Sequence, residues 1–180
     1  FCFASVKALS HFRYDELLEM GIDGVWLGYE GKQSGYSKQE GKDVDRLMRE
    51  LQDHGITVLT SMIVGIPYQT DDIARAEFSD LMGNSPALCQ FLIYGPTPGT
   101  PFYEKVMRED LLREDLVKDR RQYYKECSGF TAMVKHPFLR RESIEGLQQE
   151  FYRRDFEILG PLCGVFRVTA LRPDDDGDAV

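Results

Sequence analysis

One carboxylate in this sequence lies where it could bind a ligand. Glu30 comes two residues after the apolar segment 24–28, whose composition predicts a buried strand, and Gly31 follows it. Loops at the ends of strands commonly carry binding side chains. A carboxylate at this position could accept hydrogen bonds from the hydroxyl groups or the amine of a ligand. It could equally be a solvated acid of the loop, and position alone gives the two interpretations equal weight.

Residue types that usually carry out catalysis are not arranged in recognisable pairs. The histidines at positions 11, 54 and 136 have no nucleophile or acid at a spacing that predicts a partner. No two acids predict the carboxylate pair of a glycosidase. The segment 95–100 is rich in glycine and proline but lacks the lysine of a phosphate-binding loop. A structural role is therefore favoured for each histidine.

The cysteines are also far apart along the chain. None belongs to a CxxC, CxxxC or CxH pattern, so the sequence favours neither a disulfide scaffold nor a local metal site. The preferred interpretation for each is a small, buried apolar side chain. The four residues are Cys2, Cys89, Cys127 and Cys163.

The segment from Gly55 to Thr70 predicts the strand around which the chain is organised. It is a β-branched apolar run that follows a helical segment and stops at Gly65 and Pro67. Gly65 would let a ligand approach the backbone closely, and Pro67 prevents the strand from continuing. Thr70 and the two acids after it predict the start of a helix. In parallel α/β proteins, ligands bind at such strand ends.

The elements on both sides of this strand alternate in type. Strands are predicted at 1–6, 24–28, 55–64 and 88–94, and helices at 14–18, 44–54 and 71–82. Strict alternation predicts an α/β fold with a parallel sheet and helices outside it. Four strands are too few for an eight-stranded barrel, so the sequence predicts an open sheet or one part of a TIM-type barrel. The candidate site then contains Ser5, Glu30, 61–65 and 90–94.

The sequence divides into three parts. Residues 1–101 form the predicted sheet domain, 102–160 a helical accessory extension packed on the sheet, and 161–180 an acidic tail predicted to be partly disordered. Within the extension, helices are predicted at 102–108, 114–125 and 141–159, with an edge strand at 130–134.

The composition limits the kind of partner and the compartment. A net charge of -8 argues against a general nucleic-acid-binding surface and favours a small molecule or a protein as partner. No apolar run is long enough to cross a bilayer, and the N-terminus has no signal pattern. We therefore expect a soluble, cytoplasmic protein. The chain starts inside an apolar segment without an initiator methionine, which indicates part of a longer protein.

Five short motifs follow one another along the chain in a recognisable order. They are 24–30 (Gly-Val-Trp-Leu-Gly-Tyr-Glu), 38–42 (Lys-Gln-Glu-Gly-Lys), 55–58 (Gly-Ile-Thr-Val), 62–67 (Met-Ile-Val-Gly-Ile-Pro, with Gln-Thr at 69–70) and 96–100 (Pro-Thr-Pro-Gly-Thr). Each motif is weak alone, but independent local signals that agree support one another. Together they resemble the second half of the radical S-adenosylmethionine core. The most similar groups are the methylthiotransferases, the oxygen-independent coproporphyrinogen oxidases and the cobalamin-dependent enzymes.

The resemblance implies which residues contact the cofactor. In that family, the acid at the end of the strand matching 24–30 lies near the methionine or ribose part of S-adenosylmethionine, which makes Glu30 the candidate. A polar residue at the end of the preceding strand often contacts the cofactor too. Ser5 is therefore a further candidate.

Two later strands complete the site that the resemblance implies. The strand containing Ile-Val-Gly-Ile-Pro lines the adenine in the family, which indicates Ser61, Ile63 and Gly65. Ile63 could instead be plain core, and Ser61 could face a helix. Gln90 and Tyr94, on the strand before the Pro-Gly-Thr loop, are expected to face the substrate.

The family's defining cluster motif does not occur in this sequence. CxxxCxxC supplies three thiolates to a [4Fe-4S] cluster, and the cysteines here do not have that spacing. The motif belongs on an earlier loop, so the resemblance implies a missing N-terminal half of the barrel as partner and no S-adenosylmethionine cleavage by this chain alone. In the complete enzyme, reduction of the sulfonium would release a 5′-deoxyadenosyl radical that abstracts hydrogen from a small-molecule substrate. Similarity to the cobalamin-binding-domain subgroup adds cobalamin as a candidate cofactor.

Two other interpretations stay open. The chain could be a non-catalytic α/β scaffold or a partner-binding chain that lacks the cluster half. It could also be an unrelated half-barrel hydrolase, which the lack of a nucleophile and base pair disfavours. An in-frame CxxxCxxC in the DNA upstream would support the radical enzyme, whereas a start codon at the first residue would support the scaffold.

Overall fold

The computed structural model describes residues 1–31, 33–35 and 40–160. Its elements are β1 (Cys2–Ala4), α1 (Val6–Leu9), α2 (Tyr14–Glu19), β2 (Gly24–Glu30), α3 (Val44–Asp53), β3 (Thr57–Val64), α4 (Asp71–Met82), β4 (Leu88–Ile93), α5 (Pro101–Arg108), α6 (Glu114–Lys118), α7 (Arg120–Glu126) and α8 (Arg141–Leu159). The predicted alternation of strands and helices is therefore confirmed, and so is the long helix at 141–159.

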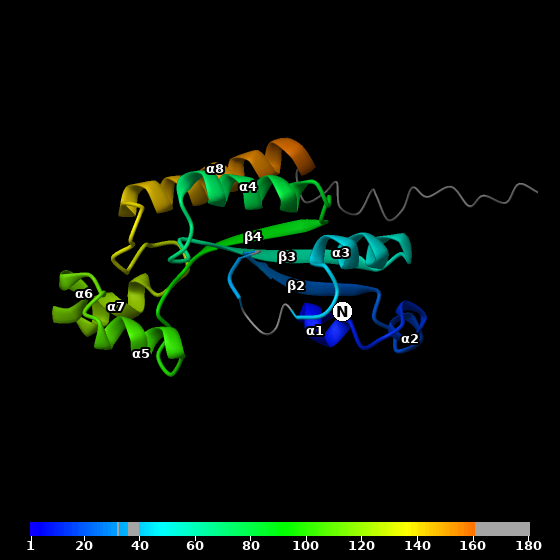
Figure 1. Ribbon diagram of the computed structural model, residues 1–180, viewed down its shortest axis with the longest axis horizontal. Coiled ribbons are helices and arrows are strands. Elements are labelled where there is room, and N and C mark those ends of the chain that lie inside the picture. Colours follow the sequence, from blue (N-terminus) through cyan, green and yellow to red (C-terminus); the bar gives the residue numbers. More distant parts are fainter. Residues whose placement is uncertain (32, 36–39, 161–180) are drawn as a thin grey trace, which may run out of the picture.

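The four strands form one parallel sheet in the order β1-β2-β3-β4, of which β2, β3 and β4 are labelled side by side in Figure 1. Ser61 in β3 pairs with Gly28 of β2 on one side and with Gln90 of β4 on the other. The register between β2 and β3 shifts between Gly28 and Glu30. Because all four strands run in the same direction, their carboxyl ends lie at the same end of the sheet. We call this end the rim.

One face of the sheet packs against helices. In β3 every second residue from Val58 to Val64 is buried, which is typical of a strand with one covered face. These side chains share a hydrophobic core with α3, α4 and α8. At its centre the rings of Phe78, Phe91 and Phe151 contact one another, with centroids 4.5 to 5.8 Å apart. The core thus joins the C-terminal helix to the sheet.

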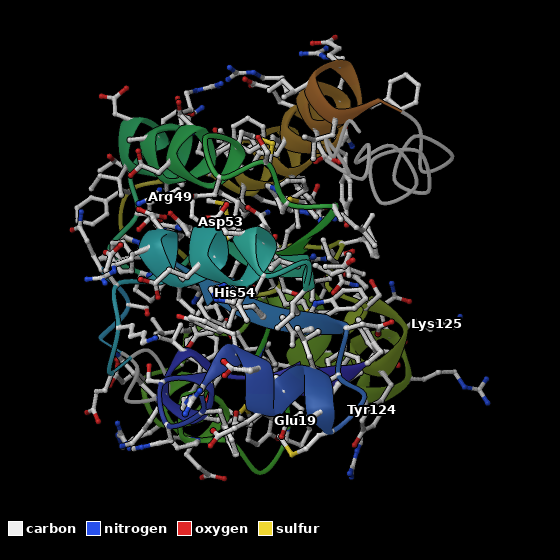
Figure 2. All side chains as sticks on the ribbon, turned by 90° about the vertical axis from the view of Figure 1, so that its right-hand side faces the viewer. Glu19, Arg49, Asp53, His54, Tyr124 and Lys125 are labelled. Atoms are coloured by element: carbon white, nitrogen blue, oxygen red, sulfur yellow. The ribbon has the colours of Figure 1, made fainter. Side chains whose placement is uncertain are left out.

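Helix α3 packs against β3 with its polar side outward. Leu47, Met48 and Leu51 are buried, and Arg49 lies along the outer part of the helix (Figure 2). The Arg49 guanidinium donates a hydrogen bond of 2.8 Å to the Asn84 side chain, beyond the end of α4. This bond ties neighbouring helices together on the covered side of the sheet.

The opposite face of the sheet, which we call the open face, carries side chains that stay partly or largely exposed. Phe3 is 77% exposed, and its ring stacks on Trp26 at 5.4 Å. The Trp26 indole N–H donates to the Ser61 hydroxyl (2.6 Å), which donates to the Gln90 carbonyl oxygen (3.3 Å). This chain of bonds runs across three strands. Parallel sheets are usually covered on both faces, so the open face is a surface on which further structure can pack.

Helix α8 closes the outer edge of β4. The Gln148 amide donates to the carbonyl oxygens of Phe91 (2.7 Å) and Gly129 (2.8 Å). The Tyr152 hydroxyl lies 3.1 Å from both the N–H and the carbonyl oxygen of Phe91, and the Ile93 N–H donates to the Gly129 oxygen (2.7 Å). These are backbone groups that a further strand would need. The sheet therefore ends at β4.

The strand predicted at 24–28 extends to Glu30, and two further predicted elements differ in extent. The strand predicted at 1–6 is shorter, because the Ser5 hydroxyl accepts a hydrogen bond from the Ala8 N–H (3.1 Å) and begins α1. The helix predicted at 114–125 is interrupted at Asp119. The Asp119 carboxylate accepts from two backbone N–H groups of the next turn (2.9 and 3.1 Å), so that α7 begins separately from α6.

The predicted edge strand at 130–134 is wrong. Val134 forms only an isolated antiparallel bridge with Leu112. The Ala132 N–H donates instead to the Glu145 carboxylate of α8 (3.1 Å). Helix side chains thus bind backbone groups of this segment that a neighbouring strand would otherwise bind.

The predicted accessory extension packs in two places. Helices α5, α6 and α7 group at one end of the sheet (Figure 1) and have a small core of their own. Its buried residues are Val106, Leu112, Leu116, Tyr123 and Met133. Helix α8, by contrast, belongs to the main core of the sheet.

Some predictions fall outside the described residues. They are the disordered tail at 161–180, Cys163 and the first two residues of the motif at 38–42. Among the helices that the structure describes, none is long and apolar enough to cross a membrane.

A partly buried acid on α8 gives a first testable prediction. One Asp155 carboxylate oxygen is buried and has no hydrogen-bond partner among the described residues. Burial raises the pKa of Asp155, and a contact with the Cys89 thiol offsets only part of this effect. Because the folded state holds the proton to a higher pH than the unfolded state does, ionisation costs stability as the pH rises. We expect Asp155→Asn to raise the free energy of unfolding at neutral pH by about 1 kcal/mol.

Urea denaturation of both proteins at neutral pH and near pH 3.8 would measure this effect. The difference in free energy of unfolding between Asp155→Asn and the wild type should shrink at the lower pH, where the wild-type acid is protonated in the folded state. A difference that does not depend on pH would show that ionisation of Asp155 is not its cause.

Candidate functional site

A cleft of about 950 Å³ lies at the carboxyl ends of β2, β3 and β4. We call it the rim cleft. Glu30, Ile63 and Tyr94 line it from these three strand ends. The opposite wall is formed by α5 and residues 127–133, and Figure 1 shows α5–α7 grouped at this end of the sheet. The volume is within the range of small-molecule sites in proteins.

Glu30 is held in an unusual backbone conformation at the rim. Its φ of 60° is in the left-handed region, which residues other than glycine rarely adopt, and its side chain is only 6% exposed. A Cβ atom on Gly28 would lie 2.6 Å from the Glu30 carboxylate, so the side chain folds back over Gly28. Backbone strain of this kind is concentrated at functional sites. The conformation therefore supports Glu30 as a binding residue.

The glycine at position 28 offers a test of this arrangement. In Gly28→Ala the new methyl group would occupy the place of the Glu30 carboxylate. Because the contact involves the flexible end of a side chain, we expect the free energy of unfolding to change by no more than about 1 kcal/mol. A crystal structure of the variant should show the carboxylate displaced from its position over residue 28. An unmoved carboxylate would contradict the geometry described here.

The loop after β3 is fixed by the side chain of Gln69. Its carbonyl oxygen accepts hydrogen bonds from the N–H groups of Gly65 (2.7 Å) and Ile66 (3.0 Å). Its amide donates to the Ile63 carbonyl oxygen (3.1 Å) and to the buried Glu77 carboxylate of α4 (2.8 Å). Gln69 is fully buried, and these bonds satisfy both ends of its side chain. The loop is therefore a fixed part of the cleft wall.

The accessory side of the cleft is held by contacts that are distant in sequence. The Tyr94 and Phe102 rings stack with centroids 3.8 Å apart. The Tyr123 hydroxyl donates to the Pro96 carbonyl oxygen. The His136 imidazole contacts the Ile66 carbonyl oxygen at 2.9 Å through Nε2. These three contacts thus join the strand-end wall to the accessory wall.

The structure brings three of the predicted site residues together. Glu30 and Ile63 line the rim cleft with Tyr94. Gly65 lines a smaller neighbouring cavity, and the side chain of Ile144 fills the space where a Cβ of Gly65 would lie, at 3.0 Å. The close approach that this glycine permits is therefore made by α8.

The other predicted residues lie elsewhere. Ser61 and Gln90 are hydrogen-bonded to each other on the open face (3.3 Å). Ser5 follows β1 at the rim but uses its hydroxyl to cap α1. Ser61 does not face a helix, because its neighbours Thr60 and Met62 point to the covered side.

Sequence reasoning missed several residues of the cleft and its support. Tyr68, Phe102 and Lys105 line the cleft, and Gln69 and Glu77 fix its loop. Glu77 could have been noticed, because it occupies an apolar position of the α4 periodicity with Ala74, Phe78 and Leu81. Residues 127–133 give no comparable signal, since only the fold brings them to the cleft.

The described residues do not fit an iron-sulfur cluster. No group of three or more histidine, cysteine or acidic side chains comes together among them. Cys2 lies in β1, Cys89 is buried in β4 and Cys127 lies at the end of α7. Cys127 lines the rim cleft, but the other two do not.

A separate ionic cluster joins α2 and α3. The Glu50 carboxylate accepts hydrogen bonds from Tyr14 and from Arg46 (2.6 Å), and the Lys42 ammonium lies 3.3 Å away. These partners, the Tyr14 bond first, lower the pKa of Glu50 to about 2. Their stabilising effect is therefore present near neutral pH and lost as the pH falls toward that value. The cluster has a structural role.

Comparisons with known proteins do not assign the chain to a family. No family model matches it. No curated protein matches it either. Function must therefore be inferred from the sequence motifs and from the rim cleft.

Proposed function

We propose that this chain is the part of a radical S-adenosylmethionine enzyme that faces the cofactor and the substrate. One observation carries the proposal: Glu30, Ile63 and Tyr94 come from three neighbouring parallel strands and line one cleft at their carboxyl ends. The resemblance assigns the first two positions to the cofactor and the third to the substrate. The cleft of about 950 Å³ has room for a nucleoside beside a small substrate.

The proposed architecture is the C-terminal half of a TIM-type barrel. The N-terminal half would add its strands beside β1, because α8 already closes the outer edge of β4. It would also cover the open face, where Phe3 is 77% exposed. This proposal explains why an apolar face of a parallel sheet stays accessible.

The residues of the rim cleft fit the adenosyl group. The Glu30 carboxylate can accept hydrogen bonds from hydroxyl groups or an amine, Ile63 offers apolar surface to the base, and Tyr94 offers its ring to the substrate. The cluster thiolates would come from another segment, since the described cysteines do not converge. When bound, S-adenosylmethionine supplies the radical chemistry, and this chain orients the reactants and excludes water. Cobalamin, where it is used, would bind to a separate domain.

Reconstitution of the complete polypeptide tests this function. The protein encoded with its upstream sequence should contain CxxxCxxC and, after anaerobic addition of iron and sulfide, should form 5′-deoxyadenosine from S-adenosylmethionine. The 180-residue chain alone should form none. A complete protein that lacks the motif, or that forms no 5′-deoxyadenosine under reducing conditions, would overturn the proposal.

Substitution of the candidate acid tests its place in the site. In the reconstituted protein, Glu30→Ala should weaken S-adenosylmethionine binding by about tenfold or more, the effect of losing a charge-assisted hydrogen bond. Glu19→Ala, at an exposed acid of α2 (Figure 2), is the matched control and should leave binding unchanged. Equal effects of the two substitutions, measured by equilibrium binding, would contradict the assignment of Glu30.

One observation favours a second candidate, a non-catalytic partner-binding chain. Two residues that the resemblance assigns to the cofactor already have partners within the chain. Ser61 is bonded to Trp26 and Gln90, and Ile144 packs on Gly65. Under this alternative, the open face would bind a protein and the reconstituted polypeptide would form no 5′-deoxyadenosine.

A further inference from the structure

A buried carboxylate lies behind the rim cleft. Glu77 of α4 is 3% exposed and accepts a hydrogen bond through each of its two oxygens. One oxygen accepts from the Tyr68 hydroxyl (2.7 Å) and, more weakly, from the Gln33 N–H (3.4 Å). The other accepts from the Gln69 amide (2.8 Å). Burying a carboxylate is costly unless it is hydrogen-bonded in this way.

One Glu77 oxygen binds both loops, through Gln33 and Tyr68, and the other binds only the loop after β3, through Gln69. Gln33 belongs to the loop after β2, which begins directly behind Glu30. Gln69 belongs to the loop after β3 and fixes the backbone of Gly65 and Ile66 (2.7 and 3.0 Å). One side chain of α4 therefore links the two loops that follow neighbouring strands.

Tyr68 brings the same carboxylate close to the backbone next to Glu30. A Cβ atom on Gly31 would lie 2.2 Å from the Tyr68 hydroxyl oxygen and 3.2 Å from a Glu77 oxygen. The Tyr68–Glu77 pair thus packs directly on the backbone that follows the left-handed Glu30. Burial and the bond to Glu77 raise the pKa of Tyr68, so that its hydroxyl stays a donor.

We infer that Glu77 is a positioning residue, which sets the place of Glu30 and of the Gly65 loop relative to each other at the rim cleft. The inference that this affects cofactor affinity rests on the proposed function; the link between the loops does not. Loss of the carboxylate would remove one of the two acceptors of the Gln69 amide and the acceptor of the Tyr68 hydroxyl at once. Both loops would then become more mobile while the core of the sheet stays intact.

Amide hydrogen exchange of the 180-residue chain, read by NMR, tests the link. Glu77→Leu should raise exchange at Gly65, Ile66 and Gln33 by about tenfold or more, as expected for loss of buried hydrogen bonds. Glu77→Gln keeps a single acceptor oxygen and should raise the exchange at these three amides less. Leu51→Ala, a buried residue of α3, controls for general loss of stability and should not single out these three amides.

The outcomes separate the inference from the proposed function. Unchanged exchange at the three amides in Glu77→Gln and Glu77→Leu would overturn the inference. If Glu77→Leu does not fold, Glu77→Gln alone decides. Titration of the complete protein with S-adenosylhomocysteine adds a second reading: Glu77→Gln should weaken binding several-fold more than Leu51→Ala does. Faster loop exchange together with no binding by the wild-type protein would remove the cofactor assignment and leave the positioning role supported.

Discussion

Replacing Phe151 by alanine is expected to lower the free energy of unfolding by about 3–5 kcal/mol. Phe151 is fully buried, stacks on Phe78 with centroids 4.5 Å apart and contacts the edge of Phe91 at 5.8 Å. Truncation removes a ring from the point where α4, α8 and β4 meet. The surrounding helices cannot fill a cavity of that size without moving, so both the burial and the packing energy are lost.

Urea denaturation measures this effect, and the same helix provides its control. Phe156 also lies on α8 but is 61% exposed. Phe156→Ala should therefore change the free energy of unfolding by about 0.5 kcal/mol or less. A loss of less than about 1 kcal/mol in Phe151→Ala would mean that α8 does not pack on the sheet as described, because losses that small are typical of surface positions.

Helix α8 also covers the outer edge of β4. Gln148 and Tyr152, on the same side of the helix as Phe151, bind the backbone of Phe91 in β4. Displacement of α8 would expose that edge to other chains. We therefore expect the destabilised variant to aggregate from its partly unfolded state.

Elements with strong local signals were predictable from the sequence. Thr70 caps α4 through a hydrogen bond from the Ile73 N–H (3.3 Å), as its position before two acids indicated. The bounds of α8 were also predicted, because its apolar spacing is regular and Gly160 ends it. In both cases the relevant interactions lie within one or two turns of the chain.

Predictions failed where a side chain, local or distant, binds the backbone. Asp119 interrupted a continuous helical pattern by capping α7. The β-prone residues 130–134 did not form a strand, since the Glu145 carboxylate of α8 accepts a hydrogen bond from the Ala132 N–H and the Gln148 amide donates one to the adjoining Gly129 carbonyl oxygen. The accessory wall of the rim cleft also depends on contacts between elements distant in sequence, such as that of His136 with the Ile66 carbonyl oxygen. Local periodicity carries no information about them, so that wall could not be predicted.

The site itself was predictable in part for the same reason. Parallel strands bring their carboxyl ends together whatever the side chains are, so Glu30, Ile63 and Tyr94 could be placed at one rim. Whether each residue faces a ligand or another part of the chain depends on packing. Gly65 is an example: the sequence predicted that a ligand would approach this glycine, but Ile144 of α8 occupies the space beside it.

This contact makes Gly65→Ala the second substitution with a large expected effect, about 2–5 kcal/mol lost from the free energy of unfolding. Gly65 has a φ of 82°, so a side chain would strain the backbone by about 1–2 kcal/mol. The added Cβ would also lie 3.0 Å from Cγ2 of Ile144, and such overpacking costs about 1–3 kcal/mol. Thermal or urea denaturation would measure the sum.

A second glycine separates the two contributions. Gly99 has a similar φ of 85°, but no atom lies within 4 Å of the place of its Cβ. Gly99→Ala should therefore cost only the backbone strain, and its difference from Gly65→Ala measures the contact with Ile144. Combining Gly65→Ala with Ile144→Ala should recover about 1 kcal/mol relative to the sum of the single changes. Equal losses in the free energy of unfolding for Gly65→Ala and Gly99→Ala would show that Ile144 of α8 does not pack on Gly65. The space beside Gly65 would then be open to a ligand.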